Sequence, residues 1–491
     1  MLLKNIFYNL GFQILPIIVA LIFIPIDIQK MGDDVFGIYS LFVTFIVIFN
    51  YINFGIAPST TKEIAKYKVL GNDDKINSIV INSFLFMFFI GMSVGYIFYF
   101  FDTNFAYLLS EKSNISVSEL KKAIDAFLLL SPLIMLVLFF RSLLEGIQNF
   151  LITALVRSLT NSIIFLVPLL YPIVKFDKIF YILIVYYIII NIILYMVVRK
   201  KFTIKISSFN IKDGQQLLYY GWWMMITSVA GIIIYYIDRY VIAFILGAIY
   251  VTYYTVAFDL ISRGNMITSN IVNVFYPYIT ELYSKRKYEV IRNQLFLLLK
   301  IIVFIMSIFA LVFIIFSKDL LIWWLNGKVN PDTIKVMQIL SVGIMFNSIA
   351  YIPNKFLNAI HLSKQVSKIF FYEMLFYPFL LFILLKLYGL SGAAISYLIR
   401  ALLESILLFN ILFRYLKIKI IVFDIIKYIL FIALSSMVIY NIELYFTNNF
   451  FIFVLSILIY AISYFSMFLS VSEKQFVMNF FKVDYGKLNK I

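Results

Sequence analysis

The sequence repeats itself at a spacing of 215 residues in two short stretches, Gly32-Asp-Asp-Val-Phe-Gly37-Ile-Tyr-Ser40 and Gly247-Ala-Ile-Tyr-Val-Thr252-Tyr-Tyr-Thr255. The same spacing relates Arg199 to Arg414. Each stretch lies between two long apolar runs, and the apolar runs that follow come in the same order after both. The pattern therefore predicts a chain that contains two copies of one structural unit.

The composition predicts a protein whose solvent is lipid. Hydrophobic residues make up 63% of the 491 residues and charged residues only 13%. A soluble domain has about half apolar and a quarter charged residues. The chain has no cysteine, which excludes disulfides and thiolate chemistry. Its single histidine, His361, disfavours a histidine-built metal or catalytic site.

Apolar runs long enough to cross a bilayer recur along the whole chain. A helical crossing needs roughly 20 mostly apolar residues. Such runs predict about fourteen spans, near 5–29, 36–57, 77–101, 124–146, 151–173, 179–198, 217–245, 250–279, 291–316, 336–358, 367–387, 391–413, 425–445 and 449–471.

These spans predict an all-α polytopic membrane protein made of two six-helix bundles in parallel repeat, followed by two further helices. The predicted parts are residues 1–215, 216–414 and 415–491, the last including a cytoplasmic tail. An even number of helices per copy gives both copies the same orientation in the membrane. Parallel repeats of this kind are an architecture of transporters, which hold their substrate near the midplane between the repeats.

The distribution of lysine and arginine predicts the orientation. Short loops on one side carry most of these residues, among them Lys62, Lys66, Lys68, Arg199, Lys200, Lys201, Arg286 and Arg292. Basic residues concentrate in cytoplasmic loops. Both termini are therefore expected in the cytoplasm, with the protein in the cytoplasmic membrane. The net charge of +16 is then mostly a topology signal, which argues against nucleic-acid binding.

No sequence motif points to an enzyme. The glycines in Gly389-Leu-Ser-Gly392 lack the lysine and hydroxyl residue that would hold a phosphate in a nucleotide loop. Small residues of this kind favour close helix packing. His361 falls in a short predicted loop, whereas a membrane acyltransferase would need a buried histidine.

Charged residues inside the spans are the candidates for function, because they are costly in lipid and usually face other helices or water. Three pairs of opposite charge have the i,i+4 spacing that puts both charges on one helix face: Arg141 with Glu145, Asp259 with Arg263, and Arg400 with Glu404. Each pair could instead be a structural clip. The predicted substrate-binding residues are Arg141, Arg239, Asp259, Arg263, Arg400 and Glu404, and further candidates are Glu145, Asp238 and Glu373.

Three segments, taken in order, resemble a known family. They are the segment from Gly32 to Ser40, the segment from Asp238 through Gly247 to Ala257, and Tyr388-Gly-Leu-Ser-Gly392-Ala-Ala-Ile-Ser. Together they resemble the polysaccharide-transporter branch of the multidrug/oligosaccharidyl-lipid/polysaccharide exporter superfamily. That branch includes the Wzx-type flippases of O-antigen and capsule repeat units. The resemblance extends over nearly the whole chain.

The resemblance implies two six-helix bundles around a central cavity and alternating access between them. It implies a flippase that carries an undecaprenyl-diphosphate-linked oligosaccharide across the cytoplasmic membrane. Lipid and the lipid-linked oligosaccharide diphosphate are the implied partners, together with other membrane proteins of polysaccharide assembly. No cofactor is implied, and coupling to a proton or sodium gradient stays open.

Two other functions remain open from the residues. A drug or cation antiporter of the same superfamily would need unpaired acids in its cavity, whereas the acids assigned to mid-depth here each have an arginine one turn away. A repeat-unit polymerase would carry a large outer loop with Arg and His. The longest predicted outer loop, 102–122, has neither.

Overall fold

A computed structural model describes residues 2–49, 55–100, 102–111, 113, 115–202, 210–327, 329–360 and 362–417, together with 456, 458–460 and 462–464. Every regular element in these residues is a helix. The span predicted at 425–445 lies outside the described residues, as does most of the span predicted at 449–471 and the position of His361.

The helices follow one another with short connections. They are α1 (Leu2–Phe49), α2 (Ile56–Val69), α3 (Asp73–Phe100), α4 (Asp102–Ser110), α5 (Val117–Asp125), α6 (Phe127–Gly146), α7 (Phe150–Leu166), η1 (Val167–Leu170), α8 (Phe176–Arg199), α9 (Ile211–Ile245), α10 (Ala248–Ser262), α11 (Gly264–Ser284), α12 (Tyr288–Ile315), α13 (Ser317–Trp324), α14 (Pro331–Ala359), α15 (Ser363–Tyr388) and α16 (Leu390–Tyr415). By length and composition, nine stretches of the described chain could cross a membrane. The predicted all-helical, multi-pass class is confirmed.

The structure has one helix break between two predicted spans and one break inside a predicted span. The first two spans form the single element α1, which is interrupted at Gly32 by non-helical backbone with a φ of 75°. The span predicted at 250–279 is divided into α10 and α11, with Arg263 between them. Ser262 and Gly264 flank that break, and glycine and serine together are a frequent cause of helix interruption.

The helix boundaries reproduce the spacing of 215 residues. The ends of α3, Asp73 and Phe100, and those of α12, Tyr288 and Ile315, differ by this spacing without a residue gained or lost. Helix α8 and helix α16 agree to within one residue at each end. The glycines that open the two repeated stretches, Gly32 and Gly247, both have positive φ, a conformation that glycine adopts readily. The repeat is thus structural as well as sequential.

The chain forms two compact units, and α15 belongs largely to the first. Unit 1 comprises Met1–Val256 and Phe370–Ala393, and unit 2 comprises Ala257–Ile369 and Ala394–Ile491. The predicted boundaries at 215 and 414 concern the repeat, and they stay a prediction.

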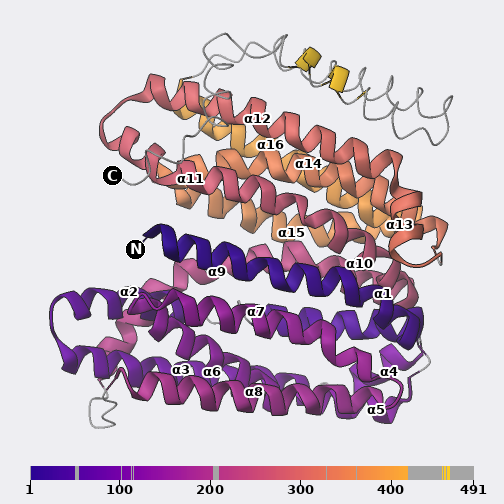
Figure 1. Cartoon of the computed structure of the whole chain (residues 1–491), viewed down its shortest axis with the longest axis horizontal. Helices are drawn as coiled ribbons and strands as arrows, with labels where there is room; N and C mark the ends of the chain where they lie inside the picture. The colour runs from indigo at the N-terminus through magenta and orange to yellow at the C-terminus, as the bar shows by residue number, and fades with distance from the viewer. Residues whose placement is uncertain are drawn as a thin grey trace. The chain divides into compact units, whose positions relative to one another are not determined.

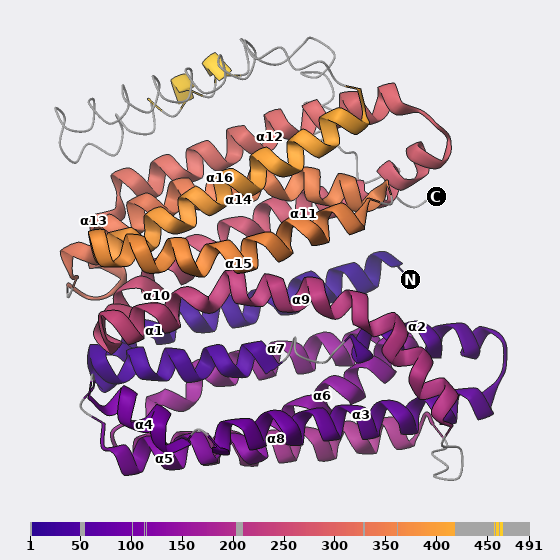
Figure 2. The ribbon, with the colours of Figure 1, turned by 180° about the vertical axis from the view of Figure 1, so that it is seen from behind.

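Unit 1 has an aromatic core between α1, α6 and α8. The rings of Phe42, Phe127 and Phe180 are buried, with centroids 4.8 to 5.8 Å apart. Figure 1 and Figure 2 show α3, α6 and α8 side by side. Gly91 of α3 faces α6 so closely that Ser131 donates a hydrogen bond to its carbonyl at 2.7 Å. Small residues let helix backbones approach in a membrane.

Unit 2 is organised around α14, which packs against both α11 and α12. The described C-terminal residues pack on α12 of the same unit. Tyr464 donates to the Lys300 carbonyl at 3.0 Å, and the hydroxyls of Tyr460 and Ser307 are 2.6 Å apart. These contacts attach part of the predicted C-terminal extension to unit 2.

Candidate functional site

Two arginines converge on one carboxylate in unit 1. Arg141 and Glu145 lie on α6, with Nη2 and Oε1 3.6 Å apart, so the predicted pair does form. Arg157 of α7 donates to the same Oε1 at 3.1 Å. The Nε of Arg141 is buried and has no hydrogen-bond partner within the described part of the chain. The group therefore keeps one positive charge in excess.

The predicted pair of Arg400 and Glu404 also forms, but deep inside unit 2. Both residues are buried on α16, and Arg400 Nη1 lies 2.8 Å from Glu404 Oε2. Asn347 of α14 donates to the same oxygen at 3.3 Å. The guanidinium also lies 4.7 Å from the centre of the Tyr397 ring. A buried pair with these partners satisfies its own charge, and its predicted role with substrate stays a prediction.

Asp259 and Arg263 lie on either side of the break between α10 and α11. Both side chains are half-buried. The Asp259 carbonyl accepts a hydrogen bond from Ser262 at 3.3 Å. Arg263 thus sits at a helix junction and not in the middle of an uninterrupted helix as predicted. Its role with substrate stays a prediction.

Arg239 and its neighbour Asp238 bind other parts of unit 1. The Asp238 carboxylate is 1% exposed and accepts hydrogen bonds from Tyr254 and, at 2.5 Å, from Tyr377 of α15. Arg239 Nη1 donates to Thr44 of α1 at 3.1 Å. These bonds join α9 to α1, α10 and α15. The geometry favours packing for this pair, although the predicted substrate contact of Arg239 is not tested by it.

One buried acid was missed by sequence reasoning. Asp27 of α1 is fully buried, and neither of its carboxylate oxygens has a hydrogen-bond partner among the described residues. Lys30, one turn away, directs its ammonium to the Leu169 carbonyl at 2.6 Å. Asp27 has no arginine one helical turn away in the sequence. It therefore differs from the acids assigned to mid-depth, each of which has an arginine at that spacing.

A lysine within the span predicted at 336–358 was also missed. Lys355 of α14 lies over two aromatic rings, 5.1 Å from the centre of Tyr351 and 6.0 Å from that of Tyr276 on α11. Within the described residues it has no carboxylate partner at ion-pair distance. Its position inside an apolar run was the signal that could have identified it.

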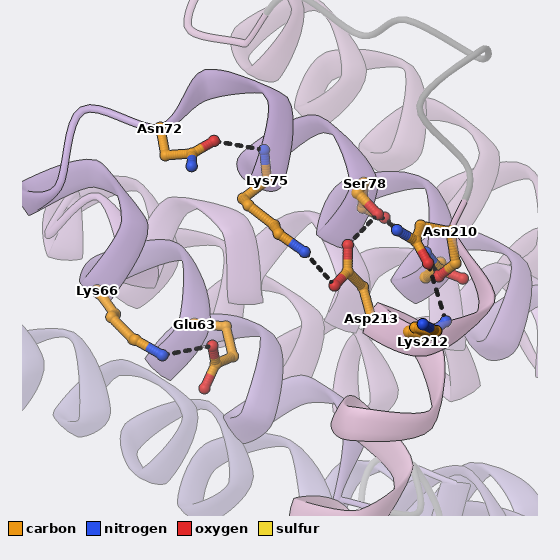
Figure 3. Close-up of polar contacts among 9 residues, drawn as sticks. Glu63, Lys66, Asn72, Lys75, Ser78, Asn210, Lys212 and Asp213 are labelled. Atoms are coloured by element: carbon orange, nitrogen blue, oxygen red, sulfur yellow. Dashed lines mark hydrogen bonds and ion pairs between the residues drawn. The ribbon is translucent and has the colours of Figure 1, made fainter.

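A polar cluster at the ends of the spans predicted at 77–101 and 217–245 fixes the start of α9 against α3 in unit 1. Asp213 accepts from Lys75 at 2.6 Å and from Ser78 at 2.7 Å (Figure 3). Asn82 binds the Asn210 carbonyl at 3.1 Å. Burial alone would raise the pKa of Asp213, but the hydrogen bonds from Lys75 and Ser78 outweigh it and hold that pKa below its ordinary value. The cluster anchors the segment that enters the second repeat.

The helical repeat and the charges within it define a class, that of multi-pass helical membrane transporters. The chain belongs to the family described as polysaccharide biosynthesis protein, which matches residues 2–283. A Shigella flexneri protein described as "Putative O-antigen transporter" is 24% identical over 420 residues, covering 83% of this chain and 96% of that protein.

Solved structures share the fold. The lipid II flippase MurJ, in an inward closed conformation, has a TM-score of 0.71 at 18% identity and covers 97% of this chain and 100% of its own. A multidrug resistance MATE family transporter of the MOP superfamily, in an inward-facing conformation, has a TM-score of 0.69 at 13% identity. The match covers 83% of this chain and 99% of that transporter. At these identities the likeness shows the fold alone. The resemblance stated from the sequence is confirmed.

Proposed function

We propose that this protein is a flippase for a lipid-linked oligosaccharide. Its cargo is an undecaprenyl-diphosphate-linked repeat unit, which it carries across the cytoplasmic membrane for the synthesis of a surface polysaccharide. The observation that supports this most directly is the convergence of Arg141 and Arg157 on the single carboxylate of Glu145. The planar fork of arginine binds phosphate oxygens in a bidentate manner, so excess guanidinium charge inside a membrane suits a diphosphate.

The family and its relatives point in the same direction. The family description concerns polysaccharide biosynthesis, and the curated relative is described as an O-antigen transporter. A solved structure that covers nearly the whole chain is a flippase of lipid II. We propose a similar class of cargo here, and we expect Arg263 to contact its headgroup.

Alternating access is the mechanism that a parallel repeat supports. Two copies of one bundle can rock against each other around a site near the membrane midplane. The intramembrane charges do not follow the repeat, since the positions equivalent to Arg141 and Glu145 hold Phe356 and Ile360. The scaffold is therefore repeated while its charges are not, as expected if one half contacts the headgroup differently from the other. We propose that both termini face the cytoplasm, where other membrane proteins of polysaccharide assembly would supply the cargo.

Antiport of a drug or cation is the second candidate, and Asp27 is the observation that favours it. A buried carboxyl group without hydrogen-bond donors can hold a proton or a monovalent cation, because leaving it ionised and unpaired in a low dielectric is costly. The same group could couple flipping to an ion gradient, so Asp27 does not by itself decide between the two functions.

The leaflet that holds the lipid-linked repeat unit in a deletion strain separates the candidates. Loss of a flippase leaves repeat units on the cytoplasmic leaflet and removes the surface polysaccharide. Loss of a drug antiporter changes sensitivity to cationic dyes and leaves the surface glycan intact. Loss of a polymerase leaves single repeat units already outside. Externally exposed repeat units in the deletion strain would overturn the proposal.

A further inference from the structure

A polar seam runs between α11 and α14 of unit 2. Ser348 donates to Asn265 at 2.8 Å, and Tyr351 donates to Asn273 at 3.2 Å. Lys355 continues the same face of α14 one turn further on, since residues four apart lie above one another on a helix. The seam therefore ends in a cation.

The seam does not look like a surface for lipid. Asn273 is exposed, and so is Tyr276 at 40%. Asn270, one turn before Asn273, is exposed as well. Amide side chains inside a span face other helices or water, because lipid offers them no hydrogen bonds. The exposed side of α11 is thus suited to a polar ligand.

Among the residues that the structure describes, Lys355 contacts aromatic rings and has no counter-ion within ion-pair distance. A cation over an aromatic face gains about 0.5–2 kcal/mol, depending on how far it is removed from water. That attraction orients the ammonium group but does not neutralise its charge. Asn354 and Asn358 lie beside it on α14 and hydrogen-bond to each other at 2.8 Å. A cation that has tyrosines and amides beside it, and no carboxylate partner in the described part of the chain, is available to pair with a bound anion.

We propose that Lys355, Tyr276 and Tyr351 form a loading site for the phosphate-bearing headgroup of the lipid-linked cargo, at the end of α14 predicted to face the cytoplasm. This inference rests on the proposed function. The lysine ammonium binds phosphate oxygens as a point charge. The tyrosine rings offer an apolar face for the adjoining sugar, and Asn354 and Asn358 offer amides for its hydroxyls.

The loading site is separate from Arg263. Along α11 the distance from Arg263 to the level of Tyr276 is about 20 Å at 1.5 Å per residue. A single diphosphate cannot contact Arg263 and Lys355 at once over that length. Lys355 therefore takes the headgroup near the membrane surface, before the cargo reaches the depth of Arg263.

Binding to the full-length protein in lipid nanodiscs tests the inference, with undecaprenyl diphosphate as the probe and inorganic pyrophosphate as the competitor. Lys355→Met keeps the length of the side chain and removes its charge. The matched control is Lys386→Met, because Lys386 also lies over a ring, 4.4 Å from Phe382, but on the exposed side of α15.

We expect Lys355→Met to weaken binding of undecaprenyl diphosphate about tenfold or more, the loss typical of a charged hydrogen bond. Lys355→Arg should stay within about threefold and Lys386→Met should bind as the unsubstituted protein does. Pyrophosphate should compete with the lipid in the unsubstituted protein and no longer do so in Lys355→Met. Competition by pyrophosphate that is equal in both proteins would place the phosphate contact elsewhere and overturn the inference.

The outcomes also separate this inference from the function beneath it. Tight binding of undecaprenyl diphosphate by Lys355→Met, with repeat units retained inside the deletion strain, would overturn the loading site and leave the flippase standing. No binding by the unsubstituted protein, with repeat units exposed outside in that strain, would overturn both. Should Lys355→Met fail to insert, Tyr351→Leu and Tyr276→Leu, which remove the rings, must weaken binding or the inference is wrong.

Discussion

Adding one methyl group at Gly37 should destabilise the contact between the two repeated stretches. A Cβ on Gly37 would lie 2.0 Å from the Ala248 carbonyl oxygen and 3.0 Å from Thr252 Oγ1, where ordinary contact begins at 3.4 Å. Thr252 in turn donates to the Asp33 carbonyl at 2.6 Å. Gly37 and Thr252 are equivalent in the repeat, as are Asp33 and Ala248, so each stretch contacts the other in the same way.

The size of the destabilisation depends on which atoms must move to make room for the Cβ. The obstacle is a backbone carbonyl of α10, which cannot rotate away as a flexible side chain would. The two stretches must therefore separate by about 1 Å, and overpacking of this kind typically costs about 1–3 kcal/mol. We expect Gly37→Ala to lie at the upper end of that range. Gly37→Val should destabilise the protein more, because its two further methyl groups add bulk at the same backbone contact.

Gly231→Ala is the matched control for this prediction. Gly231 lies in α9 of the same unit, and a Cβ there would meet nothing within 4 Å. Alanine is favoured over glycine inside a helix by about 1 kcal/mol, so this variant should be as stable as the unsubstituted protein or more stable. Thermal unfolding in a single detergent compares the variants. If Gly37→Ala unfolds at the same temperature as Gly231→Ala, the close approach of the two stretches is not what the geometry indicates.

Three other predictions use different measurements. Arg263→Ala should reduce export of the polysaccharide to below about a tenth while the amount of protein in the membrane is unchanged. Arg263→Lys should restore part of the export, because lysine keeps the positive charge but lacks the planar guanidinium. Normal export by the alanine variant would favour a structural role for Arg263. The lowered pKa of Asp213 means that its ion pair with Lys75 stabilises the protein at neutral pH. This stabilisation is at most about 1 kcal/mol, because the pair is partly exposed, and it is lost as the pH falls below about 4. Asp213→Asn should remove that part of the pH dependence of unfolding and Asp73→Asn should not; equal curves for the two would contradict the assignment. Reporter fusions test the predicted membrane orientation. Fusions after Lys68, Lys205 and Arg286 should report the cytoplasm, and fusions near Asn114 and Lys328 should report the outside. One clear reversal among the five would contradict the predicted orientation.

Much of the fold could be predicted because it depends on patterns among residues that are close in the sequence. An apolar run of a given length specifies a membrane helix wherever its neighbours lie, and a spacing of 215 residues is visible without coordinates. The i,i+4 spacing of Arg141 and Glu145, and of Arg400 and Glu404, also fixes their geometry within one helix. The structure confirms both of these pairs.

The helix break inside the span predicted at 250–279 was less visible, because such a break depends on weak local signals that packing can override. The run 250–279 is mostly apolar and its polar residues are scattered along it, so hydropathy alone did not locate the junction at Arg263. The break at Gly32, by contrast, falls in the gap between the spans predicted at 5–29 and 36–57. Glycine and serine make such breaks easy without making them necessary.

The sequence by itself determined the class of this protein, its repeat and its family, since composition, run length and spacing are properties of the chain alone. Only the tertiary structure decided which charges have partners. Asp238 accepts a hydrogen bond from the hydroxyl of Tyr377, 139 residues away, and Lys355 lies over Tyr276 of another helix. Asp27 has no hydrogen-bond partner in the described residues, although its sequence neighbourhood looks like that of any acid near the end of a span. The physical reason is that a charge in a membrane is stabilised by whatever helix packs against it, and packing between distant segments is not encoded in any local window.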